Sequence, residues 1–316
     1  MQVLVTGSNG FIASSLIDRL LKDGHEVLGL DVVEMQNRPL GRNYVPLIGD
    51  ITNPKVINED YGAKWWSDVD FCFHLAAMAN VDEVRDNREK AFQVNIHGTY
   101  NIVEVCRKYN IPLAFASTAC CYGYTTQHPS MEDGPTVPVD LYGVTKRAGE
   151  ELVKGLLKKY VILRFGTTFG PRMREALCTS IFLKQAMKKE KFTVHGSGEQ
   201  SRNFIYVDDL VDGCVKAMLF NIFSGSSEIF NLVGEKSITI LELASICYTI
   251  VNNRSPIYTN SHCTFLPCRP DDVMTEDISI EKAKLLLNWT PKVSVYNGME
   301  RIYQEWINNS HQKNWG

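Results

Sequence analysis

The chain has 316 residues, a formal net charge of −3 at pH 7, 44% hydrophobic residues and 22% charged residues. These values are typical of a globular protein with one large domain or two closely joined domains, and the charge gives no reason to expect a nucleic-acid partner. No apolar run reaches the roughly 18–20 residues that a membrane-spanning helix needs. Because the chain opens on a strand and a glycine turn rather than a signal peptide, we expect a cytoplasmic protein with reduced cysteines. The nine cysteines show no repeated pair spacing of the zinc type, so no metal site is predicted.

The first thirty residues have the pattern of a dinucleotide-binding turn. An apolar strand at residues 2–6 runs into Gly-Ser-Asn-Gly-Phe-Ile-Ala at 7–13, and an amphipathic helix follows. Gly7 permits a tight turn, Gly10 lets the backbone approach a pyrophosphate, and Ala13 lets the helix pack closely on the strand. The pyrophosphate would lie at the helix N-terminus, where free N–H groups and the helix dipole favour an anion.

The second predicted strand, Glu26 to Asp31, ends in a carboxylate. A carboxylate at this place accepts hydrogen bonds from the ribose diol and repels a 2′-phosphate. No arginine follows immediately to reverse that preference. The sequence therefore predicts NAD rather than NADP as the cofactor.

Further strands are predicted at residues 44–48, 69–74 and 112–117, and helical periodicity is present at 80–108 and 141–160. Strands that alternate with helices indicate βαβ units and a parallel sheet with right-handed crossovers. Asp50, after the third strand, could cap a turn or contact the adenine amino group. The small residues that follow the fourth strand allow the backbone to pass close to a cofactor, whereas His74 at the end of that strand is expected to be structural.

The residues with the clearest chemical potential lie between positions 115 and 146. Tyr142 and Lys146 are four residues apart in a predicted helix, so they share one face. A neighbouring ammonium lowers the pKa of a phenol from its usual value near ~10, and a hydroxyl from Thr118 or Ser117 could hydrogen-bond the same substrate oxygen. Together these groups can move a proton on and off an alcohol. A Tyr-x-x-x-Lys spacing alone is common in helices, so its significance depends on the rest of the chain.

Taken together, these features resemble the extended short-chain dehydrogenase/reductase family, in its nucleotide-sugar epimerase/dehydratase group. The resemblance covers essentially the whole chain, and the matching pieces follow the family's order and spacing. They are Gly7-x-x-Gly10-x-x-Ala13, Asp31, Gly49-Asp50-Ile51, His74-Leu75-Ala76-Ala77, Asn95 with Gly98-Thr99, Thr118, Tyr142-x-x-x-Lys146, Leu163-Arg164-Phe165, Phe169-Gly170-Pro171-Arg172, the segment 196–209, and Arg269-Pro270-Asp271.

The resemblance implies an α/β fold, namely a Rossmann doubly wound parallel sheet with a smaller C-terminal α/β substrate domain. It places an NAD-binding domain at residues 1–168 with a return at about 204–233, and a nucleotide-sugar-binding domain at 169–203 and 234–316. It also implies a set of cofactor-binding residues, which are Gly7, Asn9, Gly10, Phe11, Ile12, Asp31, Asp50, Ile51, Leu75, Ala76, Ala77, Asn95, Ser117, Tyr142 and Lys146.

The family shares a first chemical step, the oxidation of a sugar hydroxyl that is usually at C4. Tyr142 as a phenolate would take the hydroxyl proton, Thr118 would stabilise the oxygen, and Lys146 would hold the nicotinamide ribose. Ala119 and Cys120 stand where the dehydratases of the family carry Asp-Glu, and decarboxylases carry Glu at the second of these positions. The missing carboxyl groups argue against both reactions. We therefore predict an NDP-sugar 4-epimerase, with an NDP-sugar 4-dehydrogenase as an open alternative.

Cys120 keeps a third activity open. In GDP-mannose 3,5-epimerase and GDP-fucose synthase, a cysteine at the matching position exchanges a proton beside the keto group, and a polarised thiol can do this. Those enzymes also need a lysine or histidine after the Gly-Pro pair, and residues 172–182 contain neither. The simpler interpretation of Cys120 is a small thiol buried near the active site.

The resemblance also implies substrate contacts and partners. Arg202 and Arg269 are predicted to bind the substrate diphosphate, since arginine makes planar two-pronged contacts with phosphate. Thr167 stands near the position where many 4-epimerases have an asparagine, so it is a predicted substrate contact and the sugar is left open. The substrate would be a UDP-, GDP- or dTDP-linked sugar, and the family implies a homodimer through the two long helices. A non-catalytic NAD-binding sensor is an alternative from another class, although such proteins usually lose the Tyr or the Lys.

Overall fold

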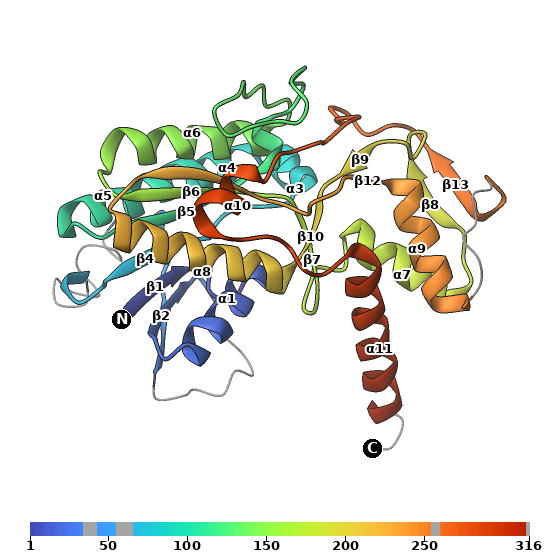
Figure 1. The fold of residues 1–316 in the computed structure, drawn as a ribbon, viewed down its shortest axis with the longest axis horizontal. Coiled ribbons are helices and arrows are strands. Elements are labelled where there is room, and N and C mark those ends of the chain that lie inside the picture. The colour runs from blue at the N-terminus through green and yellow to red at the C-terminus, as the bar shows by residue number, and fades with distance from the viewer. Residues whose placement is uncertain (34–42, 55–65, 254–259, 314–316) are drawn as a thin grey trace. The chain divides into compact units, whose positions relative to one another are not determined.

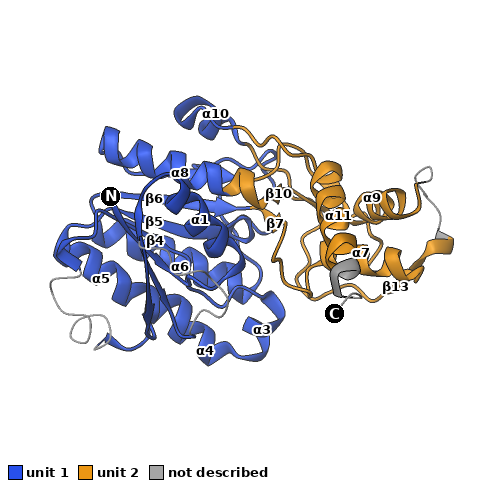
Figure 2. Ribbon diagram, turned by 90° about the horizontal axis from the view of Figure 1, so that it is seen from below, with its two compact units in different colours: residues 1–165, 211–232, 280–289 blue, residues 166–210, 233–279, 290–316 orange. Residues whose placement is uncertain are grey.

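The computed structural model describes residues 1–33, 43–54, 66–253 and 260–313. The chain divides into two compact units, coloured separately in Figure 2. Unit 1 contains residues 1–165, 211–232 and 280–289, and unit 2 contains residues 166–210, 233–279 and 290–316. Within the described part of the chain, no helix is both long and apolar enough to cross a membrane.

The observed division differs from the expected domain ranges at three places. Residues 166–168, expected in the NAD-binding domain, belong to unit 2. The chain returns to unit 1 at residue 211 rather than about 204, and residues 280–289, expected in the nucleotide-sugar-binding domain, also belong to unit 1. The reason is packing at the end of that segment. Trp289 is fully buried, and the Nζ atom of Lys216 donates a hydrogen bond to the carbonyl of Asn288 at 2.6 Å.

The core of unit 1 is a parallel sheet with strand order β11-β6-β5-β4-β1-β2-β3 (Figure 1). Each neighbouring pair runs parallel, as the alternation of strands and helices predicts. The strand order changes direction at β1, since β2 and β3 follow on one side of it and β4 to β6 on the other. The loops after β1 and β4 therefore lead to opposite sides, and sheets of this kind bind ligands in the crevice at that point. The strands are β1 (Gln2–Thr6), β2 (Glu26–Asp31), β3 (Tyr44–Ile48), β4 (Phe71–His74), β5 (Leu113–Thr118), β6 (Tyr160–Phe165) and β11 (Glu228–Leu232).

Helices cover both faces of this sheet (Figure 1). On one face α1 (Phe11–Lys22) lies beside α8 (Val207–Ser224), and Nη1 of Arg19 pairs with Oδ1 of Asp212 at 3.1 Å between them. On the other face α5 (Thr99–Tyr109) contacts α6 (Leu141–Leu156). Short helices complete the unit, namely α3 (Val81–Asp86), α4 (Arg88–Phe92), the π-helical η2 (Gln93–Gly98), the 3-10 helix η3 (Ala119–Cys121) and α10 (Glu281–Leu287).

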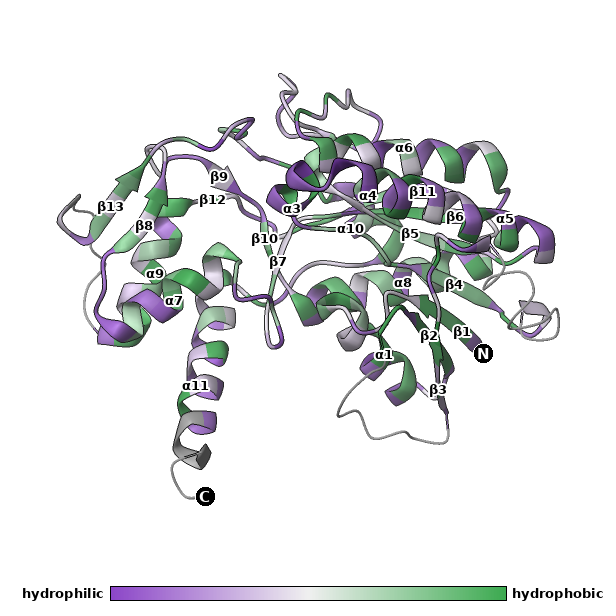
Figure 3. Cartoon of the chain, turned by 180° about the vertical axis from the view of Figure 1, so that it is seen from behind, coloured by the Kyte–Doolittle hydropathy of each residue, from purple (hydrophilic) through white to green (hydrophobic). Residues whose placement is uncertain are grey.

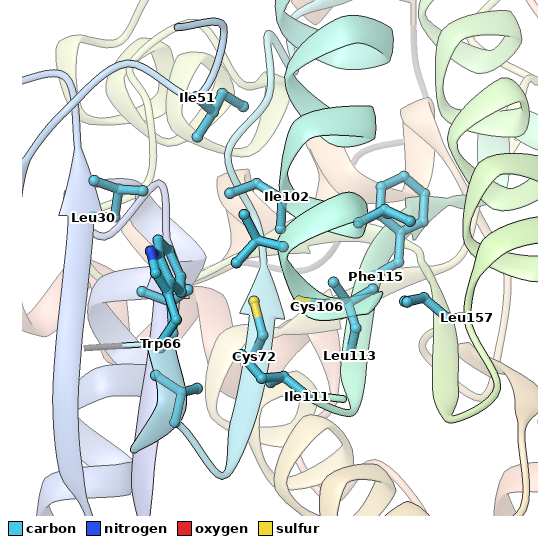
Figure 4. Packing of buried hydrophobic residues seen from close by; sticks show 14 of the residues in the cluster. Leu30, Ile51, Trp66, Cys72, Ile102, Cys106, Ile111, Leu113, Phe115 and Leu157 are labelled. Carbon is cyan, nitrogen blue, oxygen red and sulfur yellow. The ribbon is translucent and has the colours of Figure 1, made fainter. Parts of the chain in front are cut away.

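Apolar strands buried on both faces stabilise this arrangement. Figure 3 shows β1, β2 and β4 mainly in hydrophobic colours, whereas the helices carry both hydrophobic and hydrophilic faces. Figure 4 shows part of the cluster between the sheet and α5, where Cys72 of β4 and Cys106 of α5 lie beside Leu113 and Ile102. Both cysteines are free in the structure.

Two predicted helices differ in the structure. The periodicity at 80–108 is not one helix, because Asn87 leaves helical geometry and a π-helical turn follows at Gln93–Gly98. The helix predicted at 141–160 ends at Leu156, where Leu157 becomes extended and the chain enters β6. The strands at the N-terminus, in contrast, have the predicted bounds.

In the residues that the structure describes, unit 2 has helices packed around a small core with three two-stranded sheets. Strands β7 (Thr167–Phe169) and β10 (Phe204–Tyr206) are parallel, as are β8 (Phe192–His195) and β13 (Cys263–Leu266). Strands β9 (Ser201–Arg202) and β12 (Ile238–Thr239) are antiparallel. The elements packed with them include α7 (Cys178–Lys188), α9 (Ile240–Asn252), η4 (Asn260–His262) and α11 (Val295–Lys313).

Candidate active site

The turn after β1 is constrained by how closely it passes the loop after β4. Gly7 has a positive φ of 69°, and a Cβ placed there would lie 2.8 Å from the Cα and N atoms of Ala76. Only glycine satisfies both conditions without a backbone shift. The N–H of Gly7 donates to the carbonyl of Leu30 at 2.8 Å, which ties the turn to the end of β2. The two loops expected to contact the cofactor are therefore adjacent.

Asp31 organises this turn from the end of β2. Its Oδ2 accepts the N–H of Asn9 at 2.9 Å, and its Oδ1 accepts the N–H of Val33 at 3.3 Å. A carboxylate offers about four acceptor positions, so these two bonds leave room for ribose hydroxyls. The Nδ2 of Asn9 donates to the carbonyl of Val33, and its Oδ1 is buried with no hydrogen-bond partner among the described residues.

These features fit a dinucleotide. The N-cap of α1 is Gly10, which offers no side chain to satisfy the first N–H groups of the helix, so those groups are available to a pyrophosphate. The buried Oδ1 of Asn9 and the remaining acceptor positions of Asp31 suit hydroxyl donors. Phe11 and Ile12, also expected at the cofactor, form the first turn of α1 and are half-buried.

The other expected cofactor loops lie at the ends of β3 and β4. Leu75, Ala76 and Ala77 are half-exposed after β4. Asp50 is exposed and its Oδ1 accepts the N–H of Thr52 at 2.8 Å, so it caps a turn, one of the two roles considered for it. The backbone carbonyl of Ile51 accepts Nδ2 of Asn101 at 2.9 Å, which fixes this loop to α5.

His74 at the end of β4 is buried in a complete hydrogen-bond chain. Thr99 Oγ1 donates to the carbonyl of Asn95 at 2.7 Å, so that oxygen accepts from Nε2 of His74 at 3.0 Å. Nδ1 then accepts from Thr6 Oγ1 at 2.7 Å, and Thr6 Oγ1 accepts the N–H of Ala76 at 3.2 Å. Burial, followed by the charge of a neighbouring lysine, lowers the pKa of His74 to about 3. The ring is therefore neutral and structural, as expected.

Asn95 joins the loop after β4 to α6. Its Oδ1 accepts the N–H of Met78 at 2.8 Å, and its Nδ2 donates to the carbonyl of Met78 and to Thr145 Oγ1, both at 3.0 Å. Thr145 Oγ1 in turn donates to the carbonyl of Tyr142 at 2.8 Å. Both amide protons of Asn95 are thus used inside the protein, so its side chain supports the site indirectly, through the Tyr142 turn.

Helix α6 places Tyr142 in its first turn. Asp140 is the N-cap, and its Oδ1 accepts the N–H of Gly143 at 2.7 Å. A Cβ at Gly143 would lie 2.8 Å from the carbonyl oxygen of Cys120, so this turn rests directly on the segment after β5. The half-buried Tyr142 packs against the cluster of Met78, Val84 and Ala91. The structure therefore brings the Tyr142 turn to the end of β5, where Thr118 lies.

The two hydroxyl candidates at the end of β5 have different surroundings. Ser117 Oγ donates to Oε1 of Glu150 at 2.6 Å, so its proton is used inside the protein. Thr118 Oγ1 accepts the N–H of Cys120 at 3.2 Å, a bond that leaves the hydroxyl proton for another acceptor. Thr118 therefore remains the candidate for the substrate oxygen. Cys120 beside it is half-exposed.

Lys146 is buried one turn after Tyr142, with 3% of its surface exposed. Its Nζ lies over the ring of Phe115, 4.5 Å from the centroid, a geometry that favours the charged form. Burial lowers the pKa of Lys146 to about 8, while Cys121 and Glu150 act in the opposite direction. The ammonium is thus charged at neutral pH in a position that shares a helix face with the phenol.

Of the predicted substrate residues, Thr118 lies in unit 1, and Thr167, Arg202 and Arg269 lie in unit 2. Thr167 is half-buried at the start of β7, beside Phe204 of β10. The Nη1 atom of Arg202 donates to the carbonyls of Ser201 and Val273, both at 2.7 Å, and its Nη2 donates to Oδ1 of Asp272 at 2.5 Å. Its guanidinium therefore orders the segment after β13. Arg269, in that same segment, is exposed.

A buried polar network behind α6 was not predicted. Nε and Nη2 of Arg164 each donate to Glu150 at 2.9 Å, and Nη1 donates to Tyr122 Oη at 3.0 Å. Tyr122 Oη donates to Oδ1 of Asn231 at 2.7 Å, and the N–H of Asn231 donates to Oε1 of Glu132 at 2.9 Å. The sequence carries one signal of this network, because an arginine inside the apolar strand at residues 160–165 must find a buried partner.

A comparison of the sequence with models of protein families identifies the family of this chain. Residues 3–232 match the model described as "NAD dependent epimerase/dehydratase family". The chain belongs to this family. The predicted resemblance to extended short-chain dehydrogenases/reductases that act on nucleotide sugars is thereby confirmed, and so are the predictions of an enzyme and of NAD as its cofactor.

The relatives of this chain carry the names of two kinds of enzyme. The chain is 35% identical over 314 residues to UDP-glucuronic acid decarboxylase 1 of Danio rerio, covering 96% of this chain and 72% of the relative. It is 30% identical over 321 residues to a putative UDP-glucose 4-epimerase of Methanocaldococcus jannaschii, covering 98% and 99% of the two chains. Epimerases and decarboxylases of nucleotide sugars are thus both similar to this chain.

Among solved structures, a mutant UDP-glucuronic acid 4-epimerase from Bacillus cereus, in complex with UDP-4-deoxy-4-fluoro-glucuronic acid and NAD, is similar over most of the chain. The TM-score is 0.84 at 30% identity, and the match covers 96% of this chain and 98% of the other. The predicted Rossmann fold is therefore confirmed.

Proposed function

We propose that the protein is an NAD-dependent UDP-sugar 4-epimerase. The observation that carries the proposal is the segment beside Tyr142 and Lys146, where Thr118 is followed by Ala119 and Cys120 and no carboxyl group stands in either position. Inversion at C4 requires a group to move the O4 proton and a hydride acceptor that returns the hydride to the other face of C4. It requires no additional acid or base for loss of water or carbon dioxide.

The chain's own residues supply the proton chemistry. Tyr142 takes the proton from the sugar O4 and later returns it, and the charged Lys146 one turn away favours the phenolate form. Thr118 donates a hydrogen bond from its hydroxyl group to the same oxygen. Bound NAD would supply the hydride acceptor for C4.

The glycine turn, Asn9 and Asp31 would hold the dinucleotide, with the acidic residue selecting NAD over NADP. For the substrate diphosphate we propose Arg269 together with Arg202. Arg269 is exposed, whereas three of the five N–H donors of Arg202 are used within unit 2. Arg269 would therefore make the larger contact, and Arg202 would hold the segment that carries it. The choice of UDP follows the relatives and is likewise a proposal.

A UDP-glucuronic acid decarboxylase is the second candidate, since a relative of that name is 35% identical. Oxidation at C4 would again give a 4-keto sugar. That sugar would then lose carbon dioxide from C5 and be reduced to a UDP-pentose. The absence of a carboxyl side chain at position 120 favours the epimerase. The two reactions give different products from UDP-glucuronic acid.

Proton NMR of the purified protein in D2O with UDP-glucose or UDP-glucuronic acid tests the proposal. We expect the 4-epimer to form with no deuterium in the sugar. A UDP-pentose would make the protein a decarboxylase, deuterium at C3 or C5 would make it a 3,5-epimerase, and stoichiometric NADH would make it a 4-dehydrogenase. NAD binding without turnover of either sugar would contradict the epimerase.

The Tyr142→Phe variant is the matched test of the catalytic group. We expect it to bind NAD as the wild type does and to lose at least about 10²-fold in turnover, since it keeps the ring and lacks the titrating hydroxyl. Tyr296→Phe, at an exposed tyrosine of α11, is the control and should keep full turnover. Full activity of Tyr142→Phe would contradict the assignment.

A further inference from the structure

The buried carboxylate of Glu150 lies one turn after Lys146 on α6, in the network behind the helix. It is fully buried and accepts three hydrogen bonds at 2.9 Å or less, two from Arg164 of β6 and one from Ser117 of β5. Nη1 of Arg147 lies 3.5 Å from its Oε2. Lys146 and Glu150 are four residues apart on α6, so they share a helix face. Both meet β5, Lys146 at Phe115 and Glu150 at Ser117. A fully buried carboxylate is costly to desolvate, so its place on this face calls for an explanation beyond packing.

The carboxylate is ionised where it lies. Burial opposes its charge, but the hydrogen bonds and the positive charge of Arg164 outweigh that effect and lower the pKa of Glu150. The two-pronged geometry of Arg164 fixes the direction of the carboxylate as well as its charge. The position of Glu150 is therefore set by β5 and β6, and not only by α6 itself.

The groups that surround Lys146 show why this charge matters. The ring of Phe115 from β5 contacts Nζ, and His74 from β4 is neutral at physiological pH because its pKa lies near about 3. Burial raises the pKa of the Cys121 thiol to about 12, so the thiol is uncharged as well. Of the groups that favour the charged form of Lys146, Glu150 is thus the one that carries a negative charge at neutral pH.

We propose that Glu150 is a positioning residue whose carboxylate, held by Arg164 and Ser117, keeps the Lys146 ammonium charged and holds the Tyr142–Lys146 turn of α6 against the end of β5. The inference rests on the proposed role of Lys146 beside Tyr142, but it concerns a charge state that can be measured without any sugar. Nothing in the reaction requires Glu150 to touch substrate or cofactor.

The test is the titration of Lys146 itself. In the full chain labelled with ¹⁵N-lysine, the Nζ signal of Lys146 is the one that disappears in a Lys146→Arg variant. We expect it to titrate near pH 8 in the wild type and about one pH unit lower in Glu150→Gln, since a nearby opposite charge is worth about that much or more. Glu151→Gln is the control, because Glu151 is exposed and pairs with Lys154 and Arg147, and it should leave the titration unchanged.

A folded Glu150→Gln protein in which Lys146 titrates as in the wild type would overturn the proposal. Should that variant fail to fold because Arg164 is left unpaired, the double variant Glu150→Gln with Arg164→Gln removes both members of that ion pair together. Lys146 should again titrate at lower pH in this protein, and an unchanged or raised midpoint would also overturn the proposal. Failure of epimerase activity in the wild type would leave the Nζ titration intact, so the two proposals fail separately.

Discussion

His74 and Lys146 are the two buried titratable side chains whose charge states the site depends on. His74 is kept neutral by burial and by the charge of Lys146, within a chain of hydroxyl hydrogen bonds. Lys146 is held charged beside an aromatic ring and on the same helix face as a buried carboxylate. Their charge states are coupled, because the positive charge of Lys146 also lowers the pKa of His74. One consequence is a dependence of stability on pH that can be traced to a single residue.

For His74 the folded-state pKa of about 3 lies below the usual 6.5, so the unfolded chain binds more protons between these values. Stability contributed by neutral His74 is therefore complete above pH 6.5 and is lost as the pH falls toward 3. Between pH 7 and pH 5 we expect this residue to account for a loss of up to about 2 kcal/mol in the free energy of unfolding.

Urea denaturation at the two pH values measures that loss. The His74→Asn variant should be less stable at pH 7, because hydrogen bonds are lost, but it should lose less further stability on going to pH 5. The exposed His97→Asn variant is the control and should follow the wild type. Equal pH dependence of wild type and His74→Asn would contradict the assignment of a neutral buried ring.

At the scale of elements, α6 is positioned by close contact with the segment after β5. The missing side chain at Gly143 allows its backbone to lie on the carbonyl of Cys120, and Asp140 fixes the point at which the helix begins. Because the obstacle to a larger residue is backbone, the helix itself must move if a side chain is added. The geometry of Tyr142 therefore depends on a residue with no chemical function.

The Gly143→Ala variant should shift the first turn of α6 and reduce turnover by about 10²-fold, since a displacement near 1 Å at a catalytic group has an effect of that size. Gly155→Ala lies in the same helix with nothing within 4 Å of the added Cβ. It should keep full turnover and raise stability by about 0.5–1 kcal/mol. NMR turnover and urea denaturation measure both effects, and full activity of Gly143→Ala would show that the contact is not limiting.

At the scale of the whole molecule, the homodimer implied by the family remains a prediction. Helices α5 and α6 contact one another on one face of the sheet, and each leaves a large apolar side chain 41% exposed, Tyr100 on α5 and Val144 on α6. We expect a second copy of the chain to cover these residues. Association would remove these apolar side chains from contact with water, which stabilises the dimer.

Light scattering coupled to size exclusion measures the mass directly. The wild type should have twice the mass of one chain at micromolar concentration, and Val144→Lys should lower the apparent mass toward one chain. Leu285→Lys changes an even more exposed apolar residue on α10 and should leave the dimer intact. A monomeric wild type would exclude the predicted interface.

The fold was predictable because its signals are local. Apolar strands, amphipathic helices and a glycine turn each span a few residues, and their alternation limits the sheet to a parallel arrangement. The helix predicted at 80–108 was wrong in its continuity, since periodicity does not report the break at Asn87 or the π-helical turn. The return of residues 280–289 to unit 1 depends on the burial of Trp289, which no local pattern records.

The sequence by itself determined the Rossmann fold, the family, the cofactor and the residue types at the candidate active site, because each rests on spacing along the chain. Only the tertiary structure decided how those residues are used. It directs Ser117 to Glu150, engages both amide protons of Asn95 and ties Arg202 within its own unit. It also places Glu150 and Arg164, 14 residues apart, in one buried pair behind Lys146. Hydrogen-bond partners and charge states depend on which strands become neighbours, and that information appears only when the chain has folded.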